Sequence, residues 1–359
     1  MTDQDKSNDT DQKSPEPPVS ASMPRRILRR TGIGLIGLAI ACGLVWSTMA
    51  LRFSNLPIGD IGRQVLGGLV LLGFLIAFII MPKRKRTTLV FAGWFIFMLG
   101  WYLLIPASHD RNWKPEVAKL PHGEINVDQI TIHNIRNFDY SSETEFEIRY
   151  EDRTYDLSKL ESMDYLVSDW GLGTIVHSMF SFGFSDGKQL CVSVETRPEI
   201  GEEYSTVRGF FRQFELIVIL ADENDLLGQR IWHRKENVYV YPIKSTPSEL
   251  RRGFLHIIDV VNQVHAKPRW YNTLTDNCTL ALMPDASERR ITLDYRVLLN
   301  GDSPQMLYEN GVIDTQLSFE EAKKKYHVNE LAGDGPNEIH ISKRIRPDRW
   351  GKQKRAENP

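Results

Sequence analysis

Cys278 and His177 are the residues whose types could support covalent chemistry. Cys278 closes a stretch, residues 270–278, that follows an amphipathic helix and is predicted to open a short one. Asp276 and Asn277 precede it, and both residue types cap helix N-termini well. A thiol at such a position lies near the positive end of the helix dipole and near unpaired N–H groups, which favour the thiolate. Because the thiolate is the nucleophile, we interpret Cys278 as a nucleophile that needs a nearby base.

A predicted hairpin supplies that base. Residues 177–184 and 189–196 alternate apolar and polar side chains around a Ser-Asp-Gly turn. A three-residue loop over 185–187, with Gly187 in the left-handed conformation, pairs the apolar positions of the two strands with each other. The pairs expected in this register are Phe182 with Leu190, Phe180 with Val192, Met179 with Ser193, and His177 with Glu195.

The register therefore puts a polar group on the His177 face that can fix the imidazole tautomer. Glu195 is that group, and Ser193 lies one pair along. The candidate catalytic residues are Cys278, His177, Glu195, Ser193 and Asn277.

Each of these residues also has a non-catalytic interpretation. A lone cysteine is more often buried and inert, and a histidine at the start of a strand is usually only a hydrogen-bonded polar residue. Glu195 could pair with Arg197 or Arg208. Cys42 lies in an apolar run, so the three cysteines make no disulfide framework, although a Cys191–Cys278 bridge is arithmetically allowed.

Metal and cofactor chemistry is not indicated by any sequence motif. No pair of Cys or His residues has metal-ligand spacing, so we expect no metal and no cofactor. His133, His233 and His265 are interpreted as surface or packing residues. The sequence has no glycine-rich phosphate loop and no Gly-x-Ser-x-Gly elbow. A net charge of −2 over 359 residues gives no support for a nucleic-acid partner.

The N-terminal third of the chain predicts a membrane anchor. Residues 1–30 are expected to form a disordered cytoplasmic tail. Residues 31–106 contain three charge-free runs of spanning length, at about 32–51, 64–81 and 87–105. A buried core helix could be equally apolar, but three such runs separated by short loops favour membrane spans. Basic residues before the first run and between the second and third predict a cytoplasmic N-terminus, which places residues 107–359 outside.

The outer domain shows the pattern of an α+β fold. Besides the hairpin, strands are predicted at 124–134, 145–150, 214–220 and 237–243. Residues 157–166 suggest a short helix or turn. Thr246 and Ser318 each begin a capping motif, and the first predicts an amphipathic helix that ends before Pro268.

Four motifs give the outer domain a family resemblance. They are Thr131-Ile132-His133-Asn134-Ile135-Arg136-Asn137-Phe138-Asp139-Tyr140, His177-Ser178-Met179-Phe180-Ser181-Phe182-Gly183-Phe184, Ser193-Val194-Glu195-Thr196-Arg197, and Tyr271-Asn272-Thr273 with Asn277-Cys278-Thr279. With these motifs, residues 113–281 resemble the Lnb N-terminal periplasmic domain family, a permuted relative of papain-like, NlpC-type thiol enzymes. The resemblance implies a central antiparallel sheet flanked by helices, with His177 as base and Cys278 as nucleophile.

The resemblance also implies a reaction class and a location. The family's best-known activity is thiol-dependent N-acylation of bacterial lipoproteins, through an acyl-enzyme taken from phospholipid. We therefore expect a multi-pass protein of the bacterial inner membrane, a periplasmic C-terminal domain, and membrane lipid, a phospholipid acyl donor or a lipoprotein as partner. The activity would be that of an acyltransferase or acyl hydrolase. A cysteine peptidase or amidase acting on cell-wall peptides, and a non-enzymatic membrane-anchored binding module, remain alternatives.

Overall fold

The computed structural model describes residues 23–54, 56, 58–80, 84–171, 173–273, 296, 300–336 and 338–349. Its contacts divide the chain into two units. One consists of Met1–Arg52 with Ile58–Leu103, and the other of Phe53–Pro57 with Leu104–Pro359.

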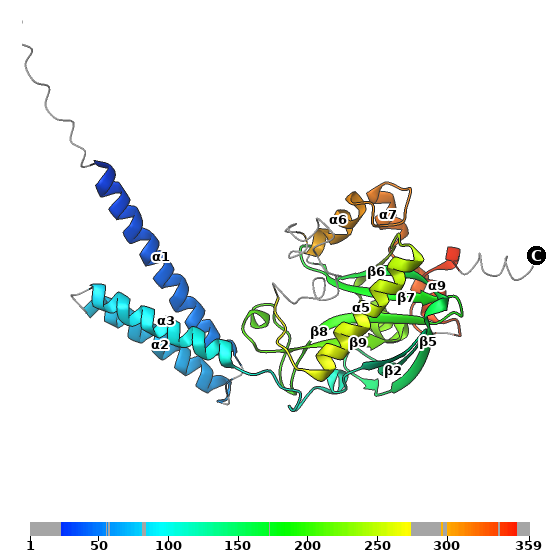
Figure 1. Cartoon of the computed structure of the whole chain (residues 1–359), viewed down its shortest axis with the longest axis horizontal. Coiled ribbons are helices and arrows are strands. Elements are labelled where there is room, and N and C mark those ends of the chain that lie inside the picture. Colours follow the sequence, from blue (N-terminus) through cyan, green and yellow to red (C-terminus); the bar gives the residue numbers. More distant parts are fainter. Residues whose placement is uncertain are drawn as a thin grey trace, which may run out of the picture. The chain divides into compact units, whose positions relative to one another are not determined.

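The first unit contains the membrane helices α1 (Met23–Phe53), α2 (Asp60–Ile80) and α3 (Arg84–Leu104) (Figure 1). Within the described residues, Arg30–Phe53, Asp60–Ile80 and Lys85–Leu104 are long and apolar enough to cross a membrane. Many of their leucines, isoleucines and valines are exposed, as lipid-facing side chains would be. These helices overlap all three predicted spans.

The second unit is built around a mixed sheet whose strands run in the order β1-β2-β9-β8-β7-β6-β10, with β5 pairing on β2. The strands of this sheet are β1 (His122–Asn126), β2 (Gln129–Arg136), β5 (Tyr150–Asp156), β6 (Leu160–Asp169), β7 (His177–Phe184), β8 (Gln189–Arg197), β9 (Glu215–Ala221) and β10 (Asn237–Pro242). A separate two-stranded sheet joins β3 (Asp139–Tyr140) to β4 (Phe146–Glu147). The α+β prediction is confirmed.

Helices cover both faces of the large sheet. They are α4 (Glu223–Gly228), α5 (Pro247–Ala266), α6 (Ser303–Glu309), α7 (Phe319–Lys325), α8 (Asn329–Ala332) and α9 (Ile341–Arg344). Short turns of other helix types are η1 (Pro115–Val117), η2 (Leu157–Lys159), η3 (Arg208–Phe210), η4 (Gln229–His233) and η9 (Asn300–Asp302). The capping boxes predicted at Thr246 and Ser318 are both present, at the starts of α5 and α7.

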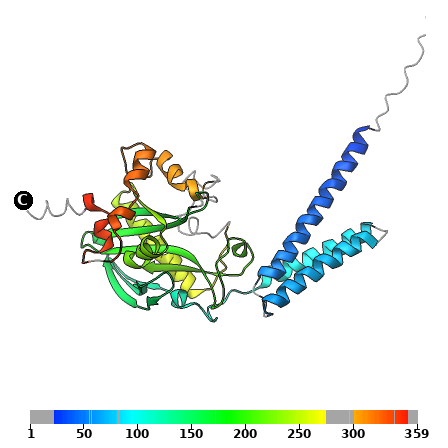
Figure 2. The same cartoon turned by 180° about the vertical axis from the view of Figure 1, so that it is seen from behind.

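Alternation along the strands builds a separate core on each face. The even-numbered side chains of β7 and β8 pack with α5, which crosses the sheet in Figure 1, and Phe182 and Phe254 meet edge to face. The odd-numbered side chains pack on the opposite face, seen from behind in Figure 2, with residues of α4, η4, α8 and α9. The odd-numbered face is the one that carries His177 and Glu195.

The predicted β7–β8 register is confirmed for three of the four expected pairs, and the pairing ends at Met179 and Ser193, before His177 and Glu195. Phe182 pairs with Leu190, Phe180 with Val192, and Met179 with Ser193. Phe184 N–H donates to the Lys188 carbonyl at 3.0 Å, which leaves a three-residue loop, and Gly187 has φ 88°. The left-handed conformation favours glycine because it carries no Cβ.

Four local predictions are wrong. The strand predicted at 145–150 is divided between β4 and β5, which belong to different sheets. Residues 124–134 form a hairpin rather than one strand, because the chain reverses at Val127, whose φ is 56°. The short helix or turn predicted at 157–166 is confined to η2. Residues 160–169 form strand β6, because pairing with β7 and β10 on both sides overrides the helix-like spacing of Leu157, Leu160 and Met163. The sheet is also not wholly antiparallel, since β2 and β9 pair in parallel at Arg136 and Ala221.

Candidate functional site

His177, Ser193 and Glu195 meet at one end of the sheet, as the register predicted. His177 is the first residue of β7, and its Nε2 lies 2.7 Å from the Ser193 Oγ. The Ser193 hydroxyl donates to Glu195 Oε1 at 2.9 Å, and Nε2 lies 3.6 Å from the same carboxylate oxygen. The serine hydroxyl therefore bridges the imidazole and the carboxylate.

The hydrogen-bond donors and acceptors of the series Glu195–Ser193–His177 fix the tautomer of His177. A carboxylate only accepts hydrogen bonds, so the Ser193 proton points toward Glu195. The Ser193 oxygen then accepts from His177, which puts the ring proton on Nε2. In this tautomer Nδ1 carries the lone pair, and it is the atom that can accept a proton from a nucleophile.

The Glu195 carboxylate is held in its charged form. Burial would raise the pKa of this carboxyl, but its interactions with His177 and the Arg230 guanidinium keep the pKa well below its usual value. Arg230 Nη2 lies 3.2 Å from Glu195 Oε1, and Arg230 Nη1 donates to the Leu226 carbonyl at 2.9 Å. An ionised carboxylate at this position stabilises an imidazolium formed on His177.

Asn300 fixes the chain on the N-terminal side of His177. Its side-chain oxygen accepts from the Val176 N–H at 3.0 Å, and its amide donates to the Val176 carbonyl at 2.7 Å. Gly301 N–H donates to the Thr174 carbonyl at 3.1 Å. The chain after residue 299 therefore holds the entrance of β7.

The described part of the cysteine stretch is attached near the start of β9. Trp270 forms a bridge with Glu215, and the Tyr271 N–H donates to the Phe214 carbonyl at 3.0 Å. The Thr273 N–H donates to the Gly209 carbonyl at 3.3 Å. Because β9 starts beside the end of β8, where Glu215 pairs with Arg197, this attachment lies at the same end of the sheet as His177.

Cys278 and Asn277 lie outside the described residues. Before them in the sequence, the described residues end at Thr273, which lies near the start of β9. After them, Asn300 is hydrogen-bonded to Val176, the residue that precedes β7. Cys191, by contrast, is a free and fully buried thiol in the core of the odd-numbered face. Burial raises its pKa well above the usual value, so it is a poor nucleophile.

Arg230 and Asn300 were not identified from the sequence. Arg230 reaches Glu195 from η4, and Asn300 reaches Val176 from η9, so neither lies near its partner in the chain. Neither residue belongs to a spacing pattern that predicts such contacts. The alternative pairing of Glu195 with Arg197 or Arg208 is replaced by its contact with Arg230.

Comparison with known proteins finds one family match, which covers part of the second unit. Residues 147–307 match the family model of the Lnb N-terminal periplasmic domain. The matched segment includes the β7–β8 hairpin and the cysteine stretch, whereas the predicted motif at 131–140 precedes it. No curated protein and no solved structure has a significant match to the chain.

Proposed function

Because residues 147–307 belong to the Lnb N-terminal periplasmic domain family, we propose that this membrane protein is a thiol acyltransferase or acyl hydrolase that works in the periplasm. Cys278 serves as nucleophile and His177 as its base. The observation that supports the proposal best is the hydrogen-bonded chain from Glu195 through Ser193 to His177. The negative charge of Glu195 is in turn held by Arg230, so this carboxylate is placed to stabilise a protonated His177.

The position of the two anchor points adds support. Thr273 and Asn300 are both bonded at the end of the sheet where His177 lies. The chain that carries Cys278 therefore begins and ends at the same end of the sheet as His177. The burial of Cys191 and the location of Cys42 in α1 leave Cys278 as the cysteine best suited to react.

The reaction proceeds in two steps. The Cys278 thiolate attacks the carbonyl carbon of an ester while His177 holds the thiol proton, and the C–O bond breaks as the proton passes to the leaving alcohol. An amine or water then attacks the thioester, His177 takes its proton, and the cysteine leaves. An amine acceptor gives acyl transfer, and water gives hydrolysis.

A membrane lipid is the proposed acyl donor. In the sequence, Ile105 directly follows the last residue of α3, and its carbonyl accepts hydrogen bonds from Arg212 and Trp270 of the second unit, each at 3.0 Å. We place the N-terminus in the cytoplasm of a bacterial inner-membrane protein, with a phospholipid as donor and a lipoprotein amine as acceptor.

Trapping of the acyl-enzyme tests this function. The full chain in detergent is incubated with a phospholipid that carries an alkyne-tagged acyl chain, and the label on the protein is measured before and after hydroxylamine treatment. We expect a hydroxylamine-sensitive label on the wild type and on the control Cys191→Ala. Cys278→Ala should carry none, and His177→Ala should be labelled far more slowly. Equal labelling of Cys278→Ala and wild type, or no label on either, would contradict the proposal.

A further inference from the structure

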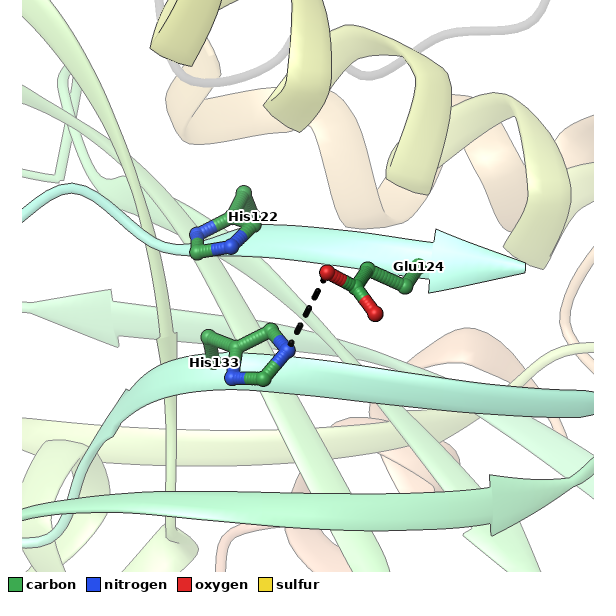
Figure 3. A group of neighbouring side chains, drawn as sticks. All are labelled: His122, Glu124 and His133. Carbon is green, nitrogen blue, oxygen red and sulfur yellow. Dashed lines mark ion pairs between the residues drawn. The ribbon is translucent and has the colours of Figure 1, made fainter.

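A second group of reactive side chains lies at the β1–β2 hairpin, away from the catalytic candidates. His122 pairs directly with His133 across the two strands, and Glu124 is two residues further along β1 on the same face. One ligand atom from each of these residues lies within 4.8 Å of the others. Figure 3 shows the two imidazoles side by side, with the Glu124 carboxylate directed toward His133.

One ring nitrogen of each histidine in this group makes no hydrogen bond to the described residues. Within the described residues, Nδ1 of His122 and Nε2 of His133 are buried without a hydrogen-bond partner. The nearest oxygen of Glu124 is 3.8 Å from Nε2 of His133, which is beyond hydrogen-bond range. Buried polar atoms of this kind usually have a partner, and a metal ion is one that would satisfy both rings.

Asp152 prepares His133 for metal binding. Its Oδ2 lies 2.8 Å from Nδ1 of His133, and because a carboxylate only accepts, the ring proton is on Nδ1. The lone pair is then on Nε2, which faces Glu124 and His122. A carboxylate that orients a histidine through its second nitrogen is the usual outer partner of a metal-binding imidazole.

The backbone holds these residues rigidly. The β2–β5 register shifts between Ile132 and Ile135, and Asn134 in this bulge has φ 60° and donates its N–H to Asp152 at 3.0 Å. On the other side, the Asn262 side chain makes two 2.8 Å hydrogen bonds to the backbone of Gly123, which ties α5 to β1. This tie brings His265, in the last turn of α5, against His122, with ring centroids 4.6 Å apart.

We propose that His122, His133 and Glu124 form a binding site for one divalent transition-metal ion, with Zn²⁺ as the best fit. Two imidazoles and one carboxylate are a common zinc ligand set, and water completes the coordination. Zinc–ligand bonds of about 2.1 Å require the donor atoms to approach one another to roughly 3.4 Å. Rotation of the Glu124 side chain, which is 73% exposed, can supply much of this movement and gives the ion a path from solvent. The site stands independently of the proposed acyl transfer.

This site was not predicted from the sequence, which was expected to hold no metal. The spacing of eleven between His122 and His133 matches no metal motif, because the ligands converge through strand pairing rather than along one helix or loop. The turn that creates the pairing, at Val127, was itself not predicted.

Zinc titration of the full chain tests the site. The protein is purified in detergent with a tag that lacks histidine, treated with chelator and titrated with ZnCl₂ by calorimetry. We expect one Zn²⁺ per chain and a rise in Tm on zinc addition. Binding should be lost in the double variant His122→Gln/His133→Gln and weakened about 10- to 100-fold in Asp152→Asn.

Two controls make the result specific. His327→Gln removes another histidine of the same domain and should bind zinc as the wild type does. Cys278→Ala should also bind normally, because the proposed site excludes the nucleophile. The absence of zinc binding to the wild type would overturn the proposal. Zinc binding that is kept in the double variant, or that is lost in Cys278→Ala, would also overturn it. Circular dichroism in the absence of zinc shows whether each variant is folded.

Discussion

The Ser193 hydroxyl is 2.7 Å from Nε2 of His177 and lies between this imidazole and the carboxylate of Glu195. In many triads the third group contacts the histidine directly, whereas here a hydroxyl transmits the orientation. Ser193 is fully buried, so water does not compete for its oxygen. In the proposed function, Ser193 is therefore a positioning residue that acts through His177.

Replacement of Ser193 tests this role. Ser193→Ala removes the acceptor that fixes the Nε2–H tautomer, so Nδ1 is no longer reliably the basic atom. We expect Cys278 alkylation by iodoacetamide near pH 7 to slow by roughly 10²-fold, the lower end of what a general base contributes. Labelling of Cys278→Ala gives the background from Cys42 and Cys191.

A control on the same strand separates chemistry from packing. Thr196→Ser changes a side chain on the other face of β8, and its alkylation rate should match that of the wild type. A Ser193→Ala protein with the wild-type rate and pH profile would show that the hydroxyl does not orient the base.

The charge of Glu195 predicts a pH-dependent contribution to stability. Its pKa in the folded protein lies well below the usual value, because the favourable interactions with His177 and Arg230 outweigh the effect of burial. The stabilisation is therefore complete above the unfolded-state pKa of about 4.3, and it is lost as the pH falls through the folded-state pKa. Glu195→Gln should lower the stability at pH 7 by about 2 kcal/mol and by much less in strong acid.

Thermal unfolding followed by circular dichroism measures this difference. For a domain of this size, about 2 kcal/mol corresponds to a fall in Tm of roughly 4–8 °C. Glu330→Gln, an exposed carboxylate on α8, is the matched control and should leave Tm unchanged at both pH values. A Tm difference between Glu195→Gln and wild type that does not change with pH would refute the linkage.

The sequence predicts the β7–β8 hairpin well, but it does not predict the β1–β2 turn or the contacts of Arg230 and Asn300. The β7–β8 register follows from alternation, because a shift by one residue would place every phenylalanine on the wrong face. The β1–β2 turn lacks this kind of signal, since Val127 takes a positive φ that is rare for a branched side chain. Arg230 and Asn300 come from distant elements, and only the folded chain brings them to Glu195 and Val176.

Asn300 links the stability of the domain to the position of His177, the proposed base. Asn300→Ala removes both hydrogen bonds to Val176 and leaves a buried N–H and a buried carbonyl without this partner. Each unsatisfied group costs about 1–3 kcal/mol, so we expect a clear fall in Tm together with slower Cys278 alkylation. Asn310→Ala, which removes a single bond to the Met306 carbonyl at the end of α6, should lower Tm less and leave alkylation unchanged. Alkylation at the wild-type rate in Asn300→Ala would show that this contact does not position His177.

The C-terminal segment is tied to the sheet by a buried ion network. Arg346 Nε lies 2.8 Å from Asp164 Oδ2, and its Nη2 lies 2.6 Å from Glu223 Oε1. Burial would raise the pKa of both carboxyls, but the charge of Arg346 keeps both pKa values below normal. Arg346→Met leaves Glu223 without its counterion and Asp164 with Arg349 alone, which should cost about 3–5 kcal/mol.

The expected consequence is a fall in Tm of roughly 6–20 °C for the Arg346→Met protein. Arg349→Met is the matched control, because Arg349 is partly exposed and Asp164 keeps its contact with Arg346. Its Tm should fall by much less. Arg346 lies beyond the family match at 147–307, so a large effect would show that the folded domain extends to residues that the family model does not include. A Tm of Arg346→Met equal to that of the wild type would instead mean that the network contributes no net stability.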